Sequence, residues 1–249
     1  MPNPAKPETV KISSGTISQL RGASTASIAT LLYKKGYHNA FIQGVVSLGE
    51  RTTNMVGPAY TLRHIPSRPD TDPIEAFREP EHPQRVAVEE CPAGAVLVMD
   101  CRQDASAASA GSILLTRCQV RGVEGVVSDG GIRDAKGAAA LLMPIFAAKP
   151  SAPTNLTKHH AIDIGLPISC GGVAVYPGDI LVGDADGVIV IPRHLATEVA
   201  NDTIEMERFE TFVLEEVRDG ASIRGIYPPT DSETLVRFEK WKTRPNRDR

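Results

Sequence analysis

The stretch from Gly111 to Asp134 constrains the fold of this chain more than any other. It reads GSILLTRCQVRGVEGVVSDGGIRD. Residues 111–120 have the pattern of a helix, and the apolar run that begins at Gly125 is typical of a short buried strand. The pair of glycines at 130–131 indicates a sharp turn. This order predicts one unit of a sheet with helices packed on it.

Strand and helix patterns alternate on both sides of this stretch. Before it, residues 95–99 (AVLVM) form a continuous apolar run, which predicts a buried strand. After it, residues 133–142 predict a helix and residues 143–147 another strand. Because such alternation is typical of parallel or mixed sheets covered by helices, we expect an α/β fold.

The N-terminal part predicts a helix over 24–36 and strands over 41–47 and 55–63. Residues 66–83 contain five prolines among many charged residues, which predicts a long irregular insertion. It could be a lid, an oligomer contact or a plain surface loop. A short helix is expected over 84–90.

The C-terminal part changes in texture. Residues 163–192 contain short β-rich runs between Gly, Pro and Asp turns, which predicts hairpins. A long helix follows over 194–218. No linker divides the chain, so we expect one domain over 15–225, with a flexible N-terminal arm over 1–14 and a C-terminal extension over 226–249.

Composition excludes several classes of partner. The chain has 27 basic and 30 acidic residues and a net charge of −3, so we expect no nucleic-acid partner. No apolar run reaches the roughly 18 residues of a membrane helix, so we expect no membrane partner. The cysteines form no CxxC pair and predict buried free thiols in a reducing, cytoplasmic location; they are Cys91, Cys101, Cys118 and Cys170.

Arg133 and Asp134 are the first candidates for chemistry. An arginine can bind a carboxylate through two parallel hydrogen bonds, and a neighbouring aspartate can hold a metal ion. The helix that starts at Gly111 offers backbone N–H groups to an anion. A structural reading stays open, in which Asp134 caps the helix that begins there and pairs with Arg133. Asp129 is expected to bond the backbone of its own turn.

Two segments resemble the RraA-like family, which includes the 4-hydroxy-4-methyl-2-oxoglutarate and 4-carboxy-4-hydroxy-2-oxoadipate aldolases. They are RGVEGVVSDGGIRD and PGDILVGDADGVIVIP, together with the helix that follows. The resemblance extends over roughly residues 20–220 and is strongest across 111–192. It implies a swivelling β/β/α-type single domain that assembles as a homotrimer or homohexamer, with sites between subunits.

The resemblance also implies an activity. The aldolases of the family are metal-dependent lyases that release pyruvate and also decarboxylate oxaloacetate. Arg133 would bind the 2-oxo acid, and Asp134 would hold Mg²⁺ or Mn²⁺. The backbone N–H groups of Ile113 and Leu114, next to Gly111, would bind the pyruvyl end of the substrate.

A glutamate from the C-terminal helix of a neighbouring subunit reaches the site in related aldolases. In this sequence that position falls on Glu210, with Glu207 one helical turn earlier. The alternative is that both glutamates lie on a solvated helix face.

The sequence departs from the family signature at one position. The signature is an Asp, twenty intervening residues and then Arg-Asp, but here Ser112 stands where the Asp is expected. A serine hydroxyl can orient a water molecule but is a poor base near pH 7. Another base could act, the substrate could need none, or catalysis could be lost. Possible substitutes are Asp104 and the pair His159 and His160, which are otherwise expected to be surface residues in a turn. Arg63 and Arg102 could add positive charge for a second carboxylate.

Three functions therefore stay open. The first is a divalent-metal lyase, an aldolase or decarboxylase, that acts on a 2-oxo acid. Its small carboxylate ligand would be pyruvate, oxaloacetate or a related acid. The second is a non-catalytic regulator of RNase E that acts by protein contact. The third is a metal lyase for a sugar-derived acid, with the insertion over 66–83 enlarging or covering the site. No glycine-rich nucleotide fingerprint follows a predicted strand.

Overall fold

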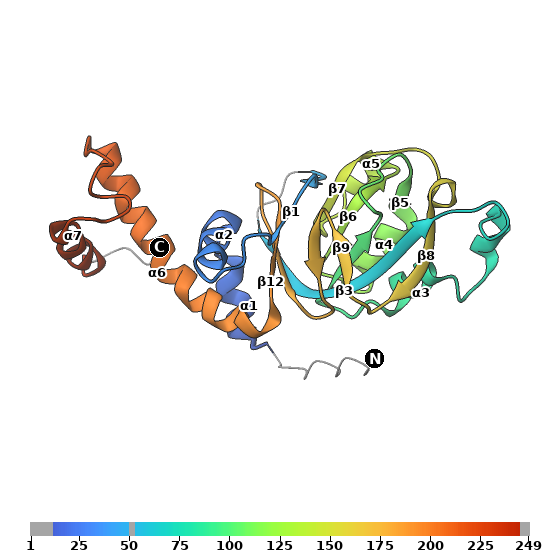
Figure 1. The fold of residues 1–249 in the computed structure, drawn as a ribbon, viewed down its shortest axis with the longest axis horizontal. Coiled ribbons are helices and arrows are strands. Elements are labelled where there is room, and N and C mark those ends of the chain that lie inside the picture. The colour runs from blue at the N-terminus through green and yellow to red at the C-terminus, as the bar shows by residue number, and fades with distance from the viewer. Residues whose placement is uncertain (1–11, 50–52, 245–249) are drawn as a thin grey trace.

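The computed structural model describes residues 12–49 and 53–244. Figure 1 shows a curled mixed sheet with helices packed around it and a long C-terminal helix that leads away from it. The α/β class with a mixed sheet is therefore confirmed. The strands are β1 Phe41–Ile42, β2 Val46–Ser47, β3 Met55–Pro66, β4 Val96–Asp100, β5 Ala108–Ala110, β6 Gly125–Ile132, β7 Ile145–Pro150, β8 His159–Ile164, β9 Ile168–Cys170, β10 Val173–Val175, β11 Ile180–Gly183 and β12 Val188–Ile191.

The main sheet has the strand order β1-β12-β11-β3-β4-β6-β7-β2, with β5 beside β6 and β8 beside β3. Strand β3 joins its two parts. Residues 55–58 of β3 pair antiparallel with β11, while residues 59–63 pair parallel with β4. The parallel strands β3, β4, β6 and β7 form the half of the sheet that carries the start of helix α4 (Ser112–Val120). Strands β9 and β10 form a separate hairpin.

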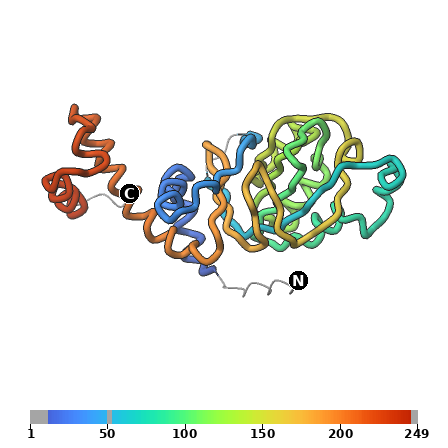
Figure 2. The backbone as a smooth tube through the Cα atoms, in the orientation of Figure 1, coloured from blue at the N-terminus to red at the C-terminus, as the bar shows by residue number. Residues whose placement is uncertain are grey.

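The helices are α1 Ser14–Arg21, α2 Thr25–Lys34, α3 Pro83–Glu90, α4 Ser112–Val120, α5 Ala135–Ala139, α6 Ala196–Arg218 and α7 Ser232–Lys242, with short 3₁₀ turns η1 Ile74–Arg78, η2 Asn155–Thr157 and η3 Arg193–Leu195. The predicted helices α2, α3, α4 and α6 are present. Helix α5 is shorter than the 133–142 range that the sequence predicts. In Figure 2 the early helices α1 and α2 lie beside α6, although the sequence separates them widely.

Two helices were not predicted. Helix α1 begins at Ser14, inside the range assigned to an N-terminal arm, of which residues 1–11 lie outside the described residues. Helix α7 lies in the C-terminal extension and packs on the end of α6 through Phe212, Phe238 and Trp241. None of the helices within 12–49 and 53–244 is both long enough and apolar enough to cross a membrane.

The prediction of a turn at Gly130 and Gly131 is wrong. Both glycines lie inside β6, all of whose residues are buried. A Cβ at Gly130 would lie 2.7 Å from Cβ and 2.8 Å from Sγ of Cys101, and a Cβ at Gly131 would lie 2.8 Å from the carbonyl oxygen of Ala107. These glycines therefore allow close packing of neighbouring segments on β6, and the strand carries Arg133 and Asp134 directly at its end.

Replacing Gly130 with alanine is expected to destabilise the fold by about 1–3 kcal/mol, because the added methyl group overpacks the contact with Cys101. Chemical denaturation followed by circular dichroism measures this loss. Gly15→Ala is the control. The added Cβ would meet no atom closer than 3.6 Å, and residue 15 lies in helix α1, where alanine is favoured over glycine. Equal stability of the two variants would contradict the close-packing role of Gly130.

Candidate functional site

A pocket of about 450 Å³ opens at the N-terminus of α4, beside the end of β6. It brings together five of the residues that the sequence singled out: Gly111, Ile113, Leu114, Arg133 and Asp134. Segments that are far apart in the sequence complete its wall. The predicted substrate and metal residues therefore lie around one hollow, and no rearrangement is needed to gather them.

Gly111 lies in direct contact with the Arg-Asp pair. A Cβ on Gly111 would lie 2.7 Å from Cγ of Arg133 and 3.0 Å from Oδ2 of Asp134. The backbone N–H of Arg133 donates to the carbonyl oxygen of Ala110 at 3.0 Å, which fixes the end of β6 against the start of α4. Only glycine leaves room for this approach.

Asp134 caps α4 rather than α5. It occupies the residue before α5 in a left-handed conformation, with φ of 56°, and its side chain makes no capping bond to that helix. Its Oδ2 instead accepts hydrogen bonds from the backbone N–H of Ser112 at 3.2 Å and from the Ser112 hydroxyl at 3.1 Å. The same oxygen lies 3.8 Å from Nε of Arg133. The predicted cap exists, but on the neighbouring helix.

The first turn of α4 keeps two N–H donors that have no partner among the described residues. The Ser112 N–H is used by Asp134, and the Leu115 N–H starts the helical ladder on Gly111 at 3.1 Å. The N–H groups of Ile113 and Leu114 fall between them, at positions that have no acceptor within a helix. They therefore offer two donors and the positive end of the helix dipole beside Arg133 and Asp134.

Three further residues of the pocket wall escaped the sequence analysis: Phe77, Arg85 and Asn155. Arg85 lies on α3, and its guanidinium carbon is 4.6 Å from the ring centroid of Phe77. Phe77 belongs to η1, inside the proline-rich insertion, so this insertion forms part of the pocket wall. Partial burial lowers the pKa of Arg85 from its usual value, although the group stays charged.

Asn155 contributes an acceptor that nothing satisfies. The residue is 4% exposed, and its Nδ2 donates to the carbonyl oxygen of Ser109 at 3.4 Å. Its Oδ1 is buried without a hydrogen-bond partner among the described residues. A buried acceptor without a partner costs about 1–3 kcal/mol, so Asn155 is a locally costly position of the pocket wall.

The candidate proton carriers lie elsewhere. Asp104 accepts hydrogen bonds from the hydroxyl and backbone N–H of Ser106, which lower its pKa. His159 and His160 lie in β8, so the prediction of surface residues in a turn is wrong. His159 is fully buried, and burial and the charge of Arg102 lower its pKa. His160 is bonded at Nδ1 to Asp72 at 2.6 Å.

Two arginine candidates have structural partners. Arg63 is paired with Asp163, with Nε 2.9 Å from Oδ2. Arg102 donates to the carbonyl oxygen of Lys158 at 2.8 Å. Neither Arg63 nor Arg102 lines the pocket.

The sequence suggested that Asp129 bonds the backbone of its own turn, but its carboxylate bonds other segments instead. Burial raises its pKa, and hydrogen bonds from three backbone N–H groups of other segments oppose the rise; the donors are Cys101, Gln103 and Gly171. Its carboxylate therefore joins neighbouring loops to β6 and does not face the pocket.

Glu207 and Glu210 hold α2 against α6. The carboxylate of Glu207 accepts from the backbone N–H of Ser24 at 2.9 Å, and Glu210 accepts from the hydroxyls of Ser27 at 3.1 Å and Tyr227 at 2.8 Å. Figure 1 shows α6 on the side of the molecule away from α4, so Glu210 does not join the pocket of its own chain.

The family model described as RraA-like, Aldolase/RraA, matches residues 25–190, which is two thirds of the chain. The chain belongs to this family. The match includes the whole segment from Gly111 to Asp134, and the predicted family membership is confirmed.

Individual relatives agree with this assignment. A predicted 4-hydroxy-4-methyl-2-oxoglutarate aldolase of Halalkalibacterium halodurans is 43% identical over 107 residues, which are 43% of this chain and 50% of the relative. The chain spans about half the length of the curated relatives that it matches.

Solved structures share the fold. RraAS2 of Streptomyces coelicolor, described as an unusual member of the RNase ES inhibitor RraA protein family, superposes with a TM-score of 0.72 at 27% identity, covering 82% of this chain and 97% of the other. An uncharacterised protein of Pseudomonas syringae gives 0.74 at 22% identity, covering 87% and 98%.

Replacing Gly111 with alanine is expected to weaken binding of oxalate, a mimic of the pyruvate enolate, by at least about tenfold, because the new methyl group displaces Arg133. Isothermal titration calorimetry in the presence of Mg²⁺ measures the change. Gly137→Ala serves as a matched control on α5. The added Cβ would lie no closer than 3.4 Å to any neighbouring atom, the nearest being Cβ of Ser112, which is an ordinary van der Waals contact. Unchanged oxalate affinity in the Gly111 variant would show that Arg133 does not bind the anion.

Proposed function

We propose that the protein is a divalent-metal-dependent carbon–carbon lyase that cleaves or decarboxylates a 2-oxo acid at the start of α4. The observation that carries the proposal is the contact of Gly111 with Arg133 and Asp134. It puts a guanidinium, a carboxylate and free helix N–H groups beside one pocket. The family includes aldolases, which agrees with this chemistry.

Asp134 fits a hard cation such as Mg²⁺ or Mn²⁺. Its Oδ2 is bonded to Ser112, whereas its Oδ1 has no hydrogen bond among the described residues. Across 12–49 and 53–244 no group of three or more His, Cys, Asp or Glu side chains could hold a metal together. Mg²⁺ commonly keeps several waters and takes one or two protein carboxylates together with substrate oxygens, so a single aspartate is a suitable anchor.

The cation, when bound, stabilises the negative charge of the pyruvate enolate as a Lewis acid. The residues of the chain bind and orient the substrate. Arg133 binds the carboxylate of the 2-oxo acid through its planar guanidinium. The N–H groups of Ile113 and Leu114 donate to oxygens at the pyruvyl end.

Ser112 favours decarboxylation over aldol cleavage. Retro-aldol cleavage needs a base to remove the proton of the substrate hydroxyl, and a serine hydroxyl is a poor base near pH 7. Loss of CO₂ from a 2-oxo acid with a carboxylate two carbons away needs no base to break the bond. The hydroxyl of Ser112 donates to Asp134 and thereby holds the carboxylate in place.

We also infer a single domain over 15–225 with an extension over 226–249, acting as a homotrimer or homohexamer. Helix α7 of the extension packs on α6. In such an oligomer, Glu210 would have to exchange its hydrogen bonds to Ser27 and Tyr227 for a neighbouring pocket. That oligomer and this role of Glu210 stay predictions.

Two alternatives have support. The RraAS2 relative carries the name of an RNase ES inhibitor family, and Ser112 in place of an acid suits a protein without catalysis. This regulator would bind an RNase E-type endonuclease, which a pull-down with purified partner tests. A lyase for a sugar-derived acid agrees with the insertion over 66–83, which supplies Phe77 to the pocket wall.

Arg133→Ala is expected to reduce kcat/KM for pyruvate release from 4-hydroxy-4-methyl-2-oxoglutarate and CO₂ release from oxaloacetate by at least about a hundredfold, because the substrate carboxylate loses its bidentate partner. Coupled pyruvate assays measure both reactions. EDTA should abolish turnover, and Mg²⁺ or Mn²⁺ should restore it. Wild-type turnover no faster than that of Arg133→Ala on any of these acids would exclude the lyase.

Ser112→Asp is expected to raise aldol cleavage relative to oxaloacetate decarboxylation, because it restores a base of the kind that the family carries at this position. The ratio of the two rates in wild type and variant measures the effect. The new carboxylate also faces Asp134, so Mg²⁺ should raise the melting temperature of the variant more than that of wild type. An unchanged ratio would show that protons follow another path.

A further inference from the structure

Arg85 is a charged group without a charged partner. It is half-buried in the pocket wall, and none of the described carboxylates forms an ion pair with it. Its pKa is lowered by loss of solvent alone. Because a desolvated guanidinium is costly unless an anion accompanies it, a charge in this position is suited to binding an anionic ligand.

Two contacts fix the orientation of the Arg85 guanidinium. The guanidinium lies 4.6 Å from the centroid of the Phe77 ring, which is within cation–π distance. Its Nη1 also donates to Oε1 of Gln84 at 3.3 Å, and Gln84 is itself held by a bond from Nε2 to the carbonyl oxygen of Ser109. An arginine has five N–H donors, so the others are available to a ligand.

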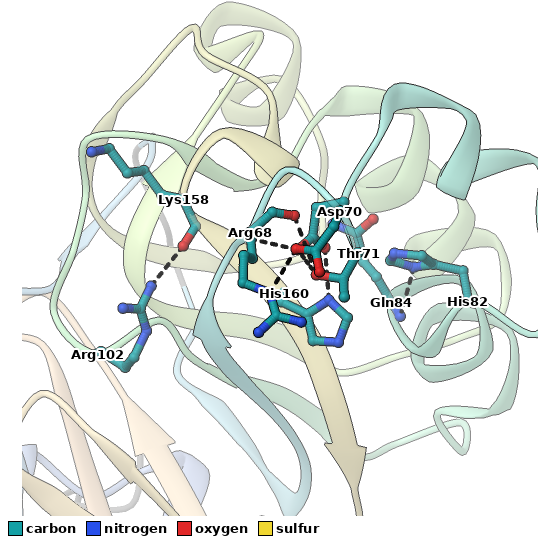
Figure 3. Close-up of polar contacts among 9 residues, drawn as sticks. Arg68, Asp70, Thr71, His82, Gln84, Arg102, Lys158 and His160 are labelled. Atoms are coloured by element: carbon teal, nitrogen blue, oxygen red, sulfur yellow. Dashed lines mark hydrogen bonds and ion pairs between the residues drawn. The ribbon is translucent and has the colours of Figure 1, made fainter.

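The insertion that supplies Phe77 is anchored. Asp72 accepts hydrogen bonds from the backbone N–H of Arg68 at 2.8 Å, from the Thr71 hydroxyl at 2.8 Å and from His160 of β8 at 2.6 Å. Figure 3 shows Arg68, Thr71 and His160 grouped around this contact. The insertion is therefore tied to the sheet, and the ring of Phe77 is held over Arg85.

A second arginine lines the same pocket. Arg133 lies in this wall at the end of β6. The pocket is thus lined by two arginines that come from different parts of the fold, α3 and the end of β6.

We propose that Arg85, held in place by Phe77, is a specificity-determining residue that binds a second anionic group of the substrate, at the end away from the 2-oxo acid group on Arg133. 4-Hydroxy-4-methyl-2-oxoglutarate, a substrate of the proposed lyase, carries such a second carboxylate, and the new element is the residue that binds it. This inference rests on the proposed binding of the 2-oxo acid by Arg133. It gives the insertion over 66–83 a role in selecting the substrate.

The test compares two ligands that differ only in the second carboxylate. Affinities for 2-oxoglutarate and 2-oxopentanoate are measured by isothermal titration calorimetry with Mg²⁺ present. Wild type is expected to prefer 2-oxoglutarate by at least about tenfold, since a bidentate guanidinium–carboxylate pair is lost in the other ligand. Arg85→Gln should remove that preference and leave 2-oxopentanoate binding unchanged.

Matched variants separate the possible causes. Arg78→Gln removes an exposed arginine next to Phe77 in the insertion and should keep the preference for 2-oxoglutarate. Phe77→Leu should reduce it, because the guanidinium loses its ring but keeps its charge. Arg85→Lys keeps the charge without the planar fork and should give an intermediate preference. This variant also covers the case in which Arg85→Gln fails to fold.

The outcomes distinguish this inference from the proposed function. Equal binding of both ligands by wild type, or a preference that survives in Arg85→Gln, overturns the role of Arg85 and leaves the lyase in place. Arg133→Gln should weaken both ligands. If neither ligand binds, or if Arg133→Gln changes neither affinity, the proposed 2-oxo acid site fails, and the role of Arg85 fails with it.

Discussion

The structure of the pocket depends on one close approach, that of Gly111 to Arg133 and Asp134. A helix start and a strand end meet there with no room for a side-chain carbon. The buried strand β6 ends directly before Arg133 and Asp134 and so positions their backbone. The hydrogen bond from the Arg133 N–H to the carbonyl oxygen of Ala110 holds this backbone beside the start of α4. The donors of α4, the guanidinium and the carboxylate are thus arranged by the backbone before any ligand arrives, which lowers the cost of ordering them on binding.

Asp134 has a double task in this arrangement. One oxygen caps α4 through Ser112, and the other has no hydrogen bond among the described residues, which agrees with the proposed cation site. A carboxylate that is already oriented by a helix cap loses little side-chain freedom when it binds a metal. In the proposed site, the replacement of an acid by Ser112 changes proton transfer more than positioning, because Ser112 still donates to Asp134.

Short sequence patterns predicted the elements that depend on neighbouring residues. Apolar runs predicted β4 and β6, and helical spacing predicted α2, α4 and α6. A short motif pointed to Arg133 and Asp134. The role of a glycine could not be read from the sequence, because a sharp turn and a close contact both require this residue. Gly130 makes a close contact with Cys101 inside β6. The pocket residues Phe77, Arg85 and Asn155 carry no local signal, since tertiary packing alone brings an irregular insertion, α3 and η2 to one wall. The burial of His159, which the sequence placed at the surface, was missed for the same reason, because the pairing of β8 with β3 buries it.

The far end of α6 has its own small core. Phe212, Phe238 and Trp241 form an aromatic cluster separate from the three clusters that surround the sheet, and the Trp241 indole donates to Glu215 at 2.8 Å. Because the sheet does not share these contacts, the pair of α7 and the end of α6 can open without disturbing β6. Amide hydrogens of α7 would then exchange through a local opening whose free energy the aromatic rings determine, while those of β6 would exchange only through global unfolding.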